Sequence, residues 1–426
     1  MREVYIVSVG MIPFGKYPDQ GIKDLTRQVM ENLLKDSPVR QDQIQAAWMS
    51  NAGWGMQSGQ HCIRGQVALG PLGIGEIPIM NVENACAGGS SALHGAWLGV
   101  AAGAYDIALA IGAEKTFVPP NATPEQKTQG FASFLAGTDV EVTVKLIEDM
   151  QAKAEQTRKE MEARGELKKG EGTGQRSPFM DIYSSGARAH MEKYGSTQRQ
   201  LAMIAAKNHY HGSLNPYAQY QMDMSVDEVL NDRLVSHPLT RAMCAPMGDG
   251  AAAAILVSKD MLSLFDGIAP VKIRASILAS ATQSAERRLP VPVQRAYDMA
   301  GVGPSDIDTA EVHDATAFGE LAQTESLGFC DVGEGGRFAE SGATRLGGTI
   351  PVNPSGGLEC RGHPIGASGL AQIAEMVYQL QGRAGKRQVA GARLALTENG
   401  GGFVGTGEAA VAIHILEGPT KKATGK

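Results

Sequence analysis

The sequence of 426 residues has few aromatic side chains, no excess of positive charge and no long hydrophobic run. Aromatic residues make up 5% of it, and the formal net charge is −6 at pH 7. A net negative chain lacks the basic face on which non-specific nucleic-acid binding depends. No apolar run approaches the roughly 20 residues that a membrane-spanning helix requires. We therefore expect neither nucleic acid nor a membrane among the partners.

Cysteine is also scarce, and no Cys-x-x-Cys pair occurs. An odd number of scattered cysteines disfavours a disulfide framework and a zinc site, and it is typical of a reducing compartment. The chain opens directly on an apolar strand, without a signal region, and its last residues are not a peroxisomal address. We expect a cytoplasmic protein with no metal and no bound cofactor of its own. The five cysteines are Cys62, Cys86, Cys244, Cys330 and Cys360.

Glycine, in contrast, is abundant, and its 53 residues separate short apolar runs from helix-length stretches. Near-continuous apolar runs are typical of strands that are covered on both faces. The alternation of strand and helix predicts an α/β architecture of sheets covered by helices. The predicted strands are Val4–Val9, Ile107–Ile111, Ala251–Val257, Val271–Leu278, Arg393–Leu396 and Ala409–Leu416. The predicted helices are Ile22–Lys35, Ser90–Ala102, Val291–Ala300 and Gly369–Leu380.

This pattern occurs twice along the chain, which indicates a duplication. Each half has a glycine-rich turn followed by an alanine-rich helix, one beginning near Cys86 and the other near His363. We predict a first half at residues 1–117 and 240–260, an inserted domain at 118–239 and a second half at 270–417.

The insertion contains a highly charged stretch, Glu141–Glu171, in which apolar residues are spaced by three and four. Such spacing predicts a helix with one apolar stripe. The stripe either packs on its own domain or forms a docking face for a partner chain. Its residues are Ile147, Met150, Ala154, Thr157 and Met161.

Cys86 is the first candidate for chemistry, because it precedes a run of small residues that opens a helix. A free thiol has a pKa of about 8.5, and a helix N-terminus favours the nucleophilic thiolate. Gly88 and Gly89 let the backbone approach a substrate closely. On this segment alone, a buried structural cysteine is the more frequent alternative.

Two histidines and a glycine run add to this candidate site. His363 lies between glycine and proline before a helix, and His313 ends a predicted strand. A histidine of near-neutral pKa can accept a thiol proton and later return it. The segment from Glu398 to Gly402 ends another strand in a glycine turn, whose backbone N–H groups could form an oxyanion hole. A structural role remains an alternative for each of these segments.

Five motifs in one order resemble those of thiolases, most closely the sterol-carrier-protein type and its bacterial and archaeal relatives. The resemblance covers nearly the whole chain, and it implies two similar αβα halves stacked as a five-layered αβαβα structure. It also implies a loop domain over the active site and a homodimer. The motifs are NACAGGSSA (Asn84–Ala92), MCAPMGDGAAAAIL (Met243–Leu256), VHDAT (Val312–Thr316), NPSGGLECRGHPIGASG (Asn353–Gly369) and TENGGG (Thr397–Gly402).

The resemblance implies a two-stage reaction with CoA as second substrate. Cys86, assisted by His363, attacks the 3-oxo carbon of a 3-oxoacyl-CoA, and an acyl-CoA enolate leaves. His313, together with a water, and His363 stabilise the enolate oxygen. CoA then attacks the acyl-enzyme, whose carbonyl oxygen faces the N–H groups of Cys86 and Gly400. The reverse sequence of steps is a condensation that forms the C–C bond.

The chain departs from the thiolase pattern at the second catalytic cysteine. Glu398 stands at one usual position of that cysteine, and Ala315 stands at the other. The leaving carbanion could take its proton from Glu398, Cys360, His313 or water. An equally open alternative is that Glu398 only orients nearby backbone or Asn399.

Three alternatives to a thiolase remain at this point. Ketoacyl-acyl-carrier synthases share a Cys-His-His set, but their glycine-turn strings differ. Thiolase-like aldolases share the fold and generally lack the nucleophilic cysteine. A non-catalytic acyl-CoA-binding subunit would have no use for the retained cysteine and both histidines.

The resemblance leaves the substrate open. It includes acetoacetyl-CoA thiolases and thiolases of aromatic compound degradation, among them those that convert benzoylsuccinyl-CoA to benzoyl-CoA and succinyl-CoA. Many bacterial and archaeal relatives work with a small zinc-ribbon/OB-fold subunit, which we expect to lie beside the loop domain. No residue of the sequence selects one of these substrates.

Overall fold

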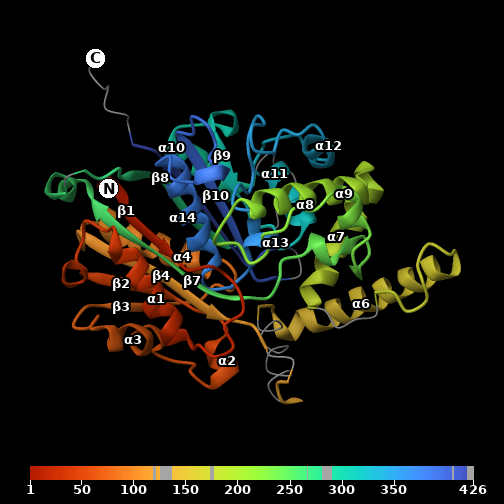
Figure 1. Ribbon diagram of the computed structural model, residues 1–426, viewed down its shortest axis with the longest axis horizontal. Helices are drawn as coiled ribbons and strands as arrows, with labels where there is room; N and C mark the ends of the chain where they lie inside the picture. The colour runs from red at the N-terminus through yellow and green to blue at the C-terminus, as the bar shows by residue number, and fades with distance from the viewer. Residues whose placement is uncertain are drawn as a thin grey trace.

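The computed structural model describes residues 1–118, 121–124, 137–172, 177–265, 267–280, 290–404 and 407–419 (Figure 1). It confirms the α/β class, and the helices α1 (Ile22–Lys35) and α10 (Val291–Ala300) have the predicted bounds. The six predicted strands are β1 (Val4–Met11), β4 (Ile107–Lys115), β7 (Asp249–Ser258), β8 (Val271–Ser280), β10 (Leu394–Gly401) and β11 (Ala410–Glu417). Three shorter strands of the same sheet were not predicted: β2 (Ala46–Ser50), β3 (Ile79–Val82) and β9 (Thr309–Glu311).

The strand order shows the duplication directly. It runs β3-β2-β4-β7-β1-β8-β11-β10-β9, so that the four inner strands of each half have the same order when they are followed outward from the contact between β1 and β8. The directions also match, because β2–β4 and β9–β10 are parallel while the pairs closer to the centre are antiparallel. Strands β1 and β8 pair only at Tyr5–Lys272 and Ile6–Val271. The structure is therefore two similar half-sheets joined at one edge.

Two helices lie between the half-sheets. Helix α4 (Gly88–Ala101) and helix α14 (Ser368–Leu380) pack against each other, and each contacts strands of both halves. Helices α1 and α10 cover the outer faces, which gives the five predicted layers (Figure 1). The middle layer is close-packed: a Cβ added at Gly89 would come within 3.0 Å of the Gly366 carbonyl oxygen. Small residues thus bring the N-terminal ends of α4 and α14 together.

The described part of the segment between β4 and β7 is mostly helical. It contains α6 (Val140–Ala163), α7 (Pro178–Tyr194), α8 (Gln198–Ser213) and α9 (Val226–Leu230), with a hairpin of β5 (Leu234–Ser236) and β6 (Leu239–Thr240). Helix α8 packs on α11 (Ala317–Ser326), α12 (Gly335–Glu340) and α13 (Gly357–Arg361) of the second half. We propose that residues 118–239 act as one unit that covers the second half.

Helix α6 carries the predicted apolar stripe. Ala154 is buried, whereas Met150, Thr157 and Met161 are half-buried, and α6 packs against α7. The side chain of Ile147 lies outside the described residues. Figure 1 shows the C-terminal end of α6 (yellow) extending away from the rest of the molecule. Packing on its own chain therefore accounts for much of the stripe. None of the helices in the described part of the chain has the length and apolarity of a membrane span.

Candidate active site

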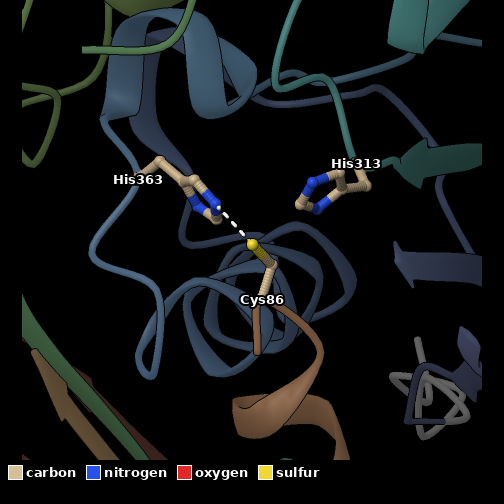
Figure 2. A group of neighbouring side chains, drawn as sticks. All are labelled: Cys86, His313 and His363. Carbon is tan, nitrogen blue, oxygen red and sulfur yellow. Dashed lines mark hydrogen bonds between the residues drawn. The ribbon is translucent and has the colours of Figure 1, made fainter. Parts of the chain in front are cut away.

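Three predicted residues from distant parts of the sequence meet at the ends of the central helices. Cys86 lies between β3 and α4, His363 between α13 and α14, and His313 just after β9. The Cys86 Sγ is 3.1 Å from His363 Nε2, and the ring centroids of the two histidines are 5.3 Å apart. Figure 2 shows both imidazole rings directed toward the sulfur. The three side chains can therefore act on one substrate atom.

The loop that carries Cys86 is backbone-strained. Ala85 has φ of +47°, a region that L-residues rarely occupy, and its N–H donates to Glu83 Oε1 at 2.6 Å. Such strain persists only where the surroundings enforce it, and it is common at functional sites. Gly401 at the end of β10 allows the close approach, because a Cβ there would overlap the backbone of Asn84 and Ala87. The second half of the chain thus holds the Cys86 loop in place.

The hydrogen bonds of His363 define its tautomer. Ser368 Oγ donates to the Pro364 carbonyl oxygen at 2.9 Å and lies 2.7 Å from His363 Nδ1. Because the hydroxyl hydrogen is already used, Nδ1 must be the donor to Ser368 Oγ. The unprotonated Nε2 then accepts the thiol hydrogen of Cys86. This arrangement makes His363 a base poised to take the Cys86 proton.

His313 has the opposite tautomer. The Asn399 side-chain amide donates from Nδ2 to His313 Nδ1 at 3.0 Å, while Asn399 Oδ1 accepts from Ser90 Oγ at 3.0 Å. Since Nδ1 is an acceptor, the ring hydrogen of neutral His313 is on Nε2. His313 can therefore donate a hydrogen bond to a substrate oxygen, as the two-stage reaction requires.

Burial decides the protonation of both reactive groups. Desolvation raises the pKa of the Cys86 thiol to about 12, outweighing a hydrogen bond from the Gly402 backbone that lowers this pKa. Burial, with added repulsion from His313 and Arg361, lowers the pKa of His363 well below its usual value. The loss of hydration therefore opposes the helix N-terminus, which favours the thiolate. Both shifts favour a neutral thiol beside a neutral imidazole at rest.

This resting state predicts how alkylation of Cys86 depends on pH. While the pH stays well below a thiol pKa near 12, the thiolate fraction grows about tenfold for each unit by which the pH rises. We expect the rate constant for iodoacetamide to rise about tenfold per unit from pH 7 to pH 9, measured by mass spectrometry of the Cys86 peptide. A rate constant that stays level above pH 6 would instead show a thiolate–imidazolium pair.

A cavity of about 890 Å³ opens onto Cys86, His313 and His363. Its wall is largely apolar, and the contributing side chains include Met56, Phe179, Met180, Ile182, Phe318 and Ile365. Arg233 and Arg241, both exposed, also lie on this wall. The cavity thus combines an apolar interior with cationic groups, as a negatively charged thioester with an acyl chain would require.

The structure places Glu398 behind the cavity wall. The side chain is buried, and its Oε2 accepts from the backbone N–H of His313 at 2.9 Å. Glu398 is not among the residues that line the cavity, and Cys360 is fully buried in α13. Gly400 lines the cavity but belongs to β10, where it pairs with Val411. The glycine turn therefore begins later than predicted, at Gly402, which has φ of +67°.

Sequence reasoning missed two carboxylates at this site. Glu114, at the end of β4, is buried and accepts hydrogen bonds from the N–H groups of Ala52, Gly53 and Gly366. It thereby ties the turn that follows His363 to the first half. Glu408, in the turn before β11, lines the cavity. The only signal for Glu114 was an acidic residue just after a predicted apolar strand.

The cluster of Cys86, His313 and His363 is the only group among the described residues whose His, Cys or carboxylate donors could share one metal ion. Its three donor atoms lie within 4.8 Å of one another. One thiolate and two imidazoles would suit zinc. The same geometry also suits nucleophilic and acid–base chemistry, because His363 Nε2 lies within hydrogen-bond distance of the Cys86 thiol.

Family models match both halves of the chain. The model described as the thiolase N-terminal domain matches residues 4–260, and the model described as thiolase C-terminal domain-like matches residues 274–414. An acetyl-CoA acetyltransferase of Methanothermobacter thermautotrophicus is 37% identical over 98% of this chain and 100% of its own. The benzoylsuccinyl-CoA thiolase subunit BbsB of Thauera aromatica is 33% identical over 94% of this chain and 95% of its own. Sterol carrier protein 2 of Bos taurus is 34% identical over 99% of this chain and 76% of its own.

Solved structures share the fold at lower identity. The Ltp2-ChsH2(DUF35) aldolase superposes with a TM-score of 0.73 at 20% identity, and 98% of each chain is covered. Human mitochondrial 3-ketoacyl-CoA thiolase in complex with CoA gives a TM-score of 0.69 at 17% identity, again with 98% of each chain covered.

Proposed function

The chain belongs to the thiolase family and is an acyltransferase, and we propose that it cleaves or forms a 3-oxoacyl-CoA through an acyl group bound to Cys86. The observation that carries this proposal is the 3.1 Å contact between Cys86 Sγ and His363 Nε2, with His313 facing the same point. The same contact favours a thiolase over a thiolase-like aldolase, because an aldolase needs no acylated cysteine.

In the first stage, the Cys86 sulfur attacks the 3-oxo carbon while its proton moves to His363 Nε2. The C2–C3 bond then breaks, and the acyl group stays on sulfur. The negative charge that develops on the departing enolate oxygen meets the Nε2–H of His313. A preorganised donor in a desolvated site stabilises such charge most strongly in the transition state.

In the second stage, the thiol of CoA attacks the acyl-enzyme and the Cys86 sulfur leaves with the proton held by His363. The acyl oxygen needs donors on the opposite side of the sulfur. We propose the N–H groups of Cys86 and Gly400 for this oxyanion hole, with Gly402 as a third donor. Gly402 is supported by the hydrogen bond from its backbone to Cys86.

The substrate proposal is a 3-oxoacyl-CoA with a chain larger than acetoacetyl, such as benzoylsuccinyl-CoA. The apolar cavity wall and the similarity to BbsB support it. The acetyl-CoA acetyltransferase at higher identity supports acetoacetyl-CoA as the alternative. A panel of 3-oxoacyl-CoA esters, cleaved with CoA, decides between them by kcat/KM. Higher kcat/KM for acetoacetyl-CoA than for every aromatic ester would reject the larger substrate.

We further propose a cytoplasmic homodimer that binds a small zinc-ribbon/OB-fold subunit. The five free cysteines fit a reducing compartment, and the kind of partner follows from the resemblance to bacterial and archaeal thiolases. One similar protein is named a subunit, and another is named with a DUF35 component. Both names support an assembly. Co-expression with an adjacent small reading frame, followed by light scattering and zinc analysis, tests it. A fully active, zinc-free homodimer would reject the partner.

A further inference from the structure

The two-stage reaction needs one acid that the Cys86–His363 pair does not supply. The enolate that leaves in the first stage must gain a proton at C2, and the CoA thiol must lose one in the second. His363 is already committed, because it holds the Cys86 proton between the stages. Burial lowers the pKa of His313 to about 4, so its ring is neutral and is a weak proton donor.

Several acidic groups on the cavity wall are poorly suited to this task. Cys244 donates its S–H to the Thr240 carbonyl oxygen at 3.3 Å, and burial raises its pKa. Burial also raises the pKa of Tyr183 well above its usual value. Glu83 is exposed, and its carboxylate already accepts the Ala85 N–H.

Glu408 is the remaining carboxyl group among the described residues that line this cavity. It lies on the wall with Cys86, His363 and Gly400, and its Oε1 accepts from Gln323 Nε2 at 2.9 Å. Gly400 makes room for it, because a Cβ at that position would overlap the Glu408 carboxyl. The Glu408 carboxyl group thus lies against Gly400 of β10, at the wall of the cavity.

We propose that Glu408 is the catalytic acid and base that stands in for the second cysteine of thiolases. This inference rests on the proposed function. In the first stage the Glu408 carboxyl gives its proton to C2 of the leaving enolate and becomes a carboxylate. In the second stage the carboxylate takes the proton of the CoA thiol as its sulfur attacks, which restores the acid. Every proton is returned after one turnover.

The surroundings of Glu408 suit a carboxyl group that both gives and takes a proton near neutral pH. Burial raises its pKa to about 7, against the hydrogen bond from Gln323, which lowers this pKa. Glu408 interacts electrostatically with Glu398, Tyr183 and Cys86, none of which is a cation. Glu398 remains a positioning residue in this scheme, through its hydrogen bond to the His313 backbone.

The test compares Glu408→Gln, Glu398→Gln and a surface control, Glu31→Gln on α1, with the wild type. Acylation of Cys86 by an S-phenyl thioester is followed as a burst of released thiophenolate, a leaving group that needs no proton. Exchange of the C2 hydrogens of acetyl-CoA and succinyl-CoA is followed in D₂O, and thiolysis is followed with CoA. Removing a general acid–base group typically costs about 10²–10⁴-fold. We expect Glu408→Gln to lose at least about 100-fold in exchange and thiolysis, with its burst within about twofold of the wild type.

Several results would overturn this assignment. One is exchange at the wild-type rate in Glu408→Gln, and another is loss of exchange in Glu398→Gln alone. Loss of the burst in Glu408→Gln would also overturn it, because a proton donor to C2 is not needed for that step. A wild-type enzyme without a burst would instead reject the proposed function itself, so the two failures are distinct.

Discussion

Replacing Cys86 by alanine or serine is expected to lower the rate of thiolysis by at least about three orders of magnitude. Removal of a covalent nucleophile typically has an effect of this size. Serine keeps a hydroxyl near His363 Nε2, but this group is far less acidic than a thiol and its oxygen is a poorer nucleophile. Mass spectrometry of enzyme mixed with a 3-oxoacyl-CoA should show an acyl adduct on the wild type and none on either variant.

A matched control is available in Cys62, which is exposed and lies off the cavity wall. Cys62→Ala should retain the wild-type rate and the acyl adduct. Substantial thiolysis by Cys86→Ala would contradict the acyl-enzyme route and favour an aldolase-like reaction on the same fold.

The largest expected effect on stability concerns the buried ion pair beneath the His363 loop. Arg361 Nη1 lies 2.8 Å from Glu311 Oε2, and both side chains are almost fully buried. Ser355 donates a backbone and a hydroxyl hydrogen bond to the same carboxylate. Arg361→Met would leave the Glu311 charge buried without its cation, which costs about 3–5 kcal/mol. Urea denaturation at one fixed protein concentration measures this loss in the free energy of unfolding.

A second variant separates the charge effect from a packing effect. In Arg361→Met with Glu311→Gln no charge is left buried, so we expect much of the lost stability to return. Arg337→Met, which breaks an exposed pair with Glu334, should change the free energy of unfolding little. Equal destabilisation in the single and the double variant would show that the shape of Arg361, and not its charge, matters.

The longer elements of the fold could be predicted because each has a local pattern. The apolar runs of β1 and β7 and the periodic spacing of α1 and α10 are visible within a few residues of sequence. The short strands β2, β3 and β9 were missed, since three to five residues carry little periodicity. Their place is decided by neighbours such as β4 and β10, which come from distant parts of the chain.

The sequence by itself determined the α/β class, the duplication and the residues Cys86, His313 and His363, because short motifs and periodic patterns carry that information. Only the tertiary structure decided the protonation of the site. Burial raises the pKa of the Cys86 thiol, and Ser368 and Asn399 select opposite histidine tautomers. Tertiary structure also placed Glu398 behind the wall and Glu408 on it. Desolvation and hydrogen bonding depend on what surrounds a group in space, and for these residues the surroundings come from segments far away in the chain.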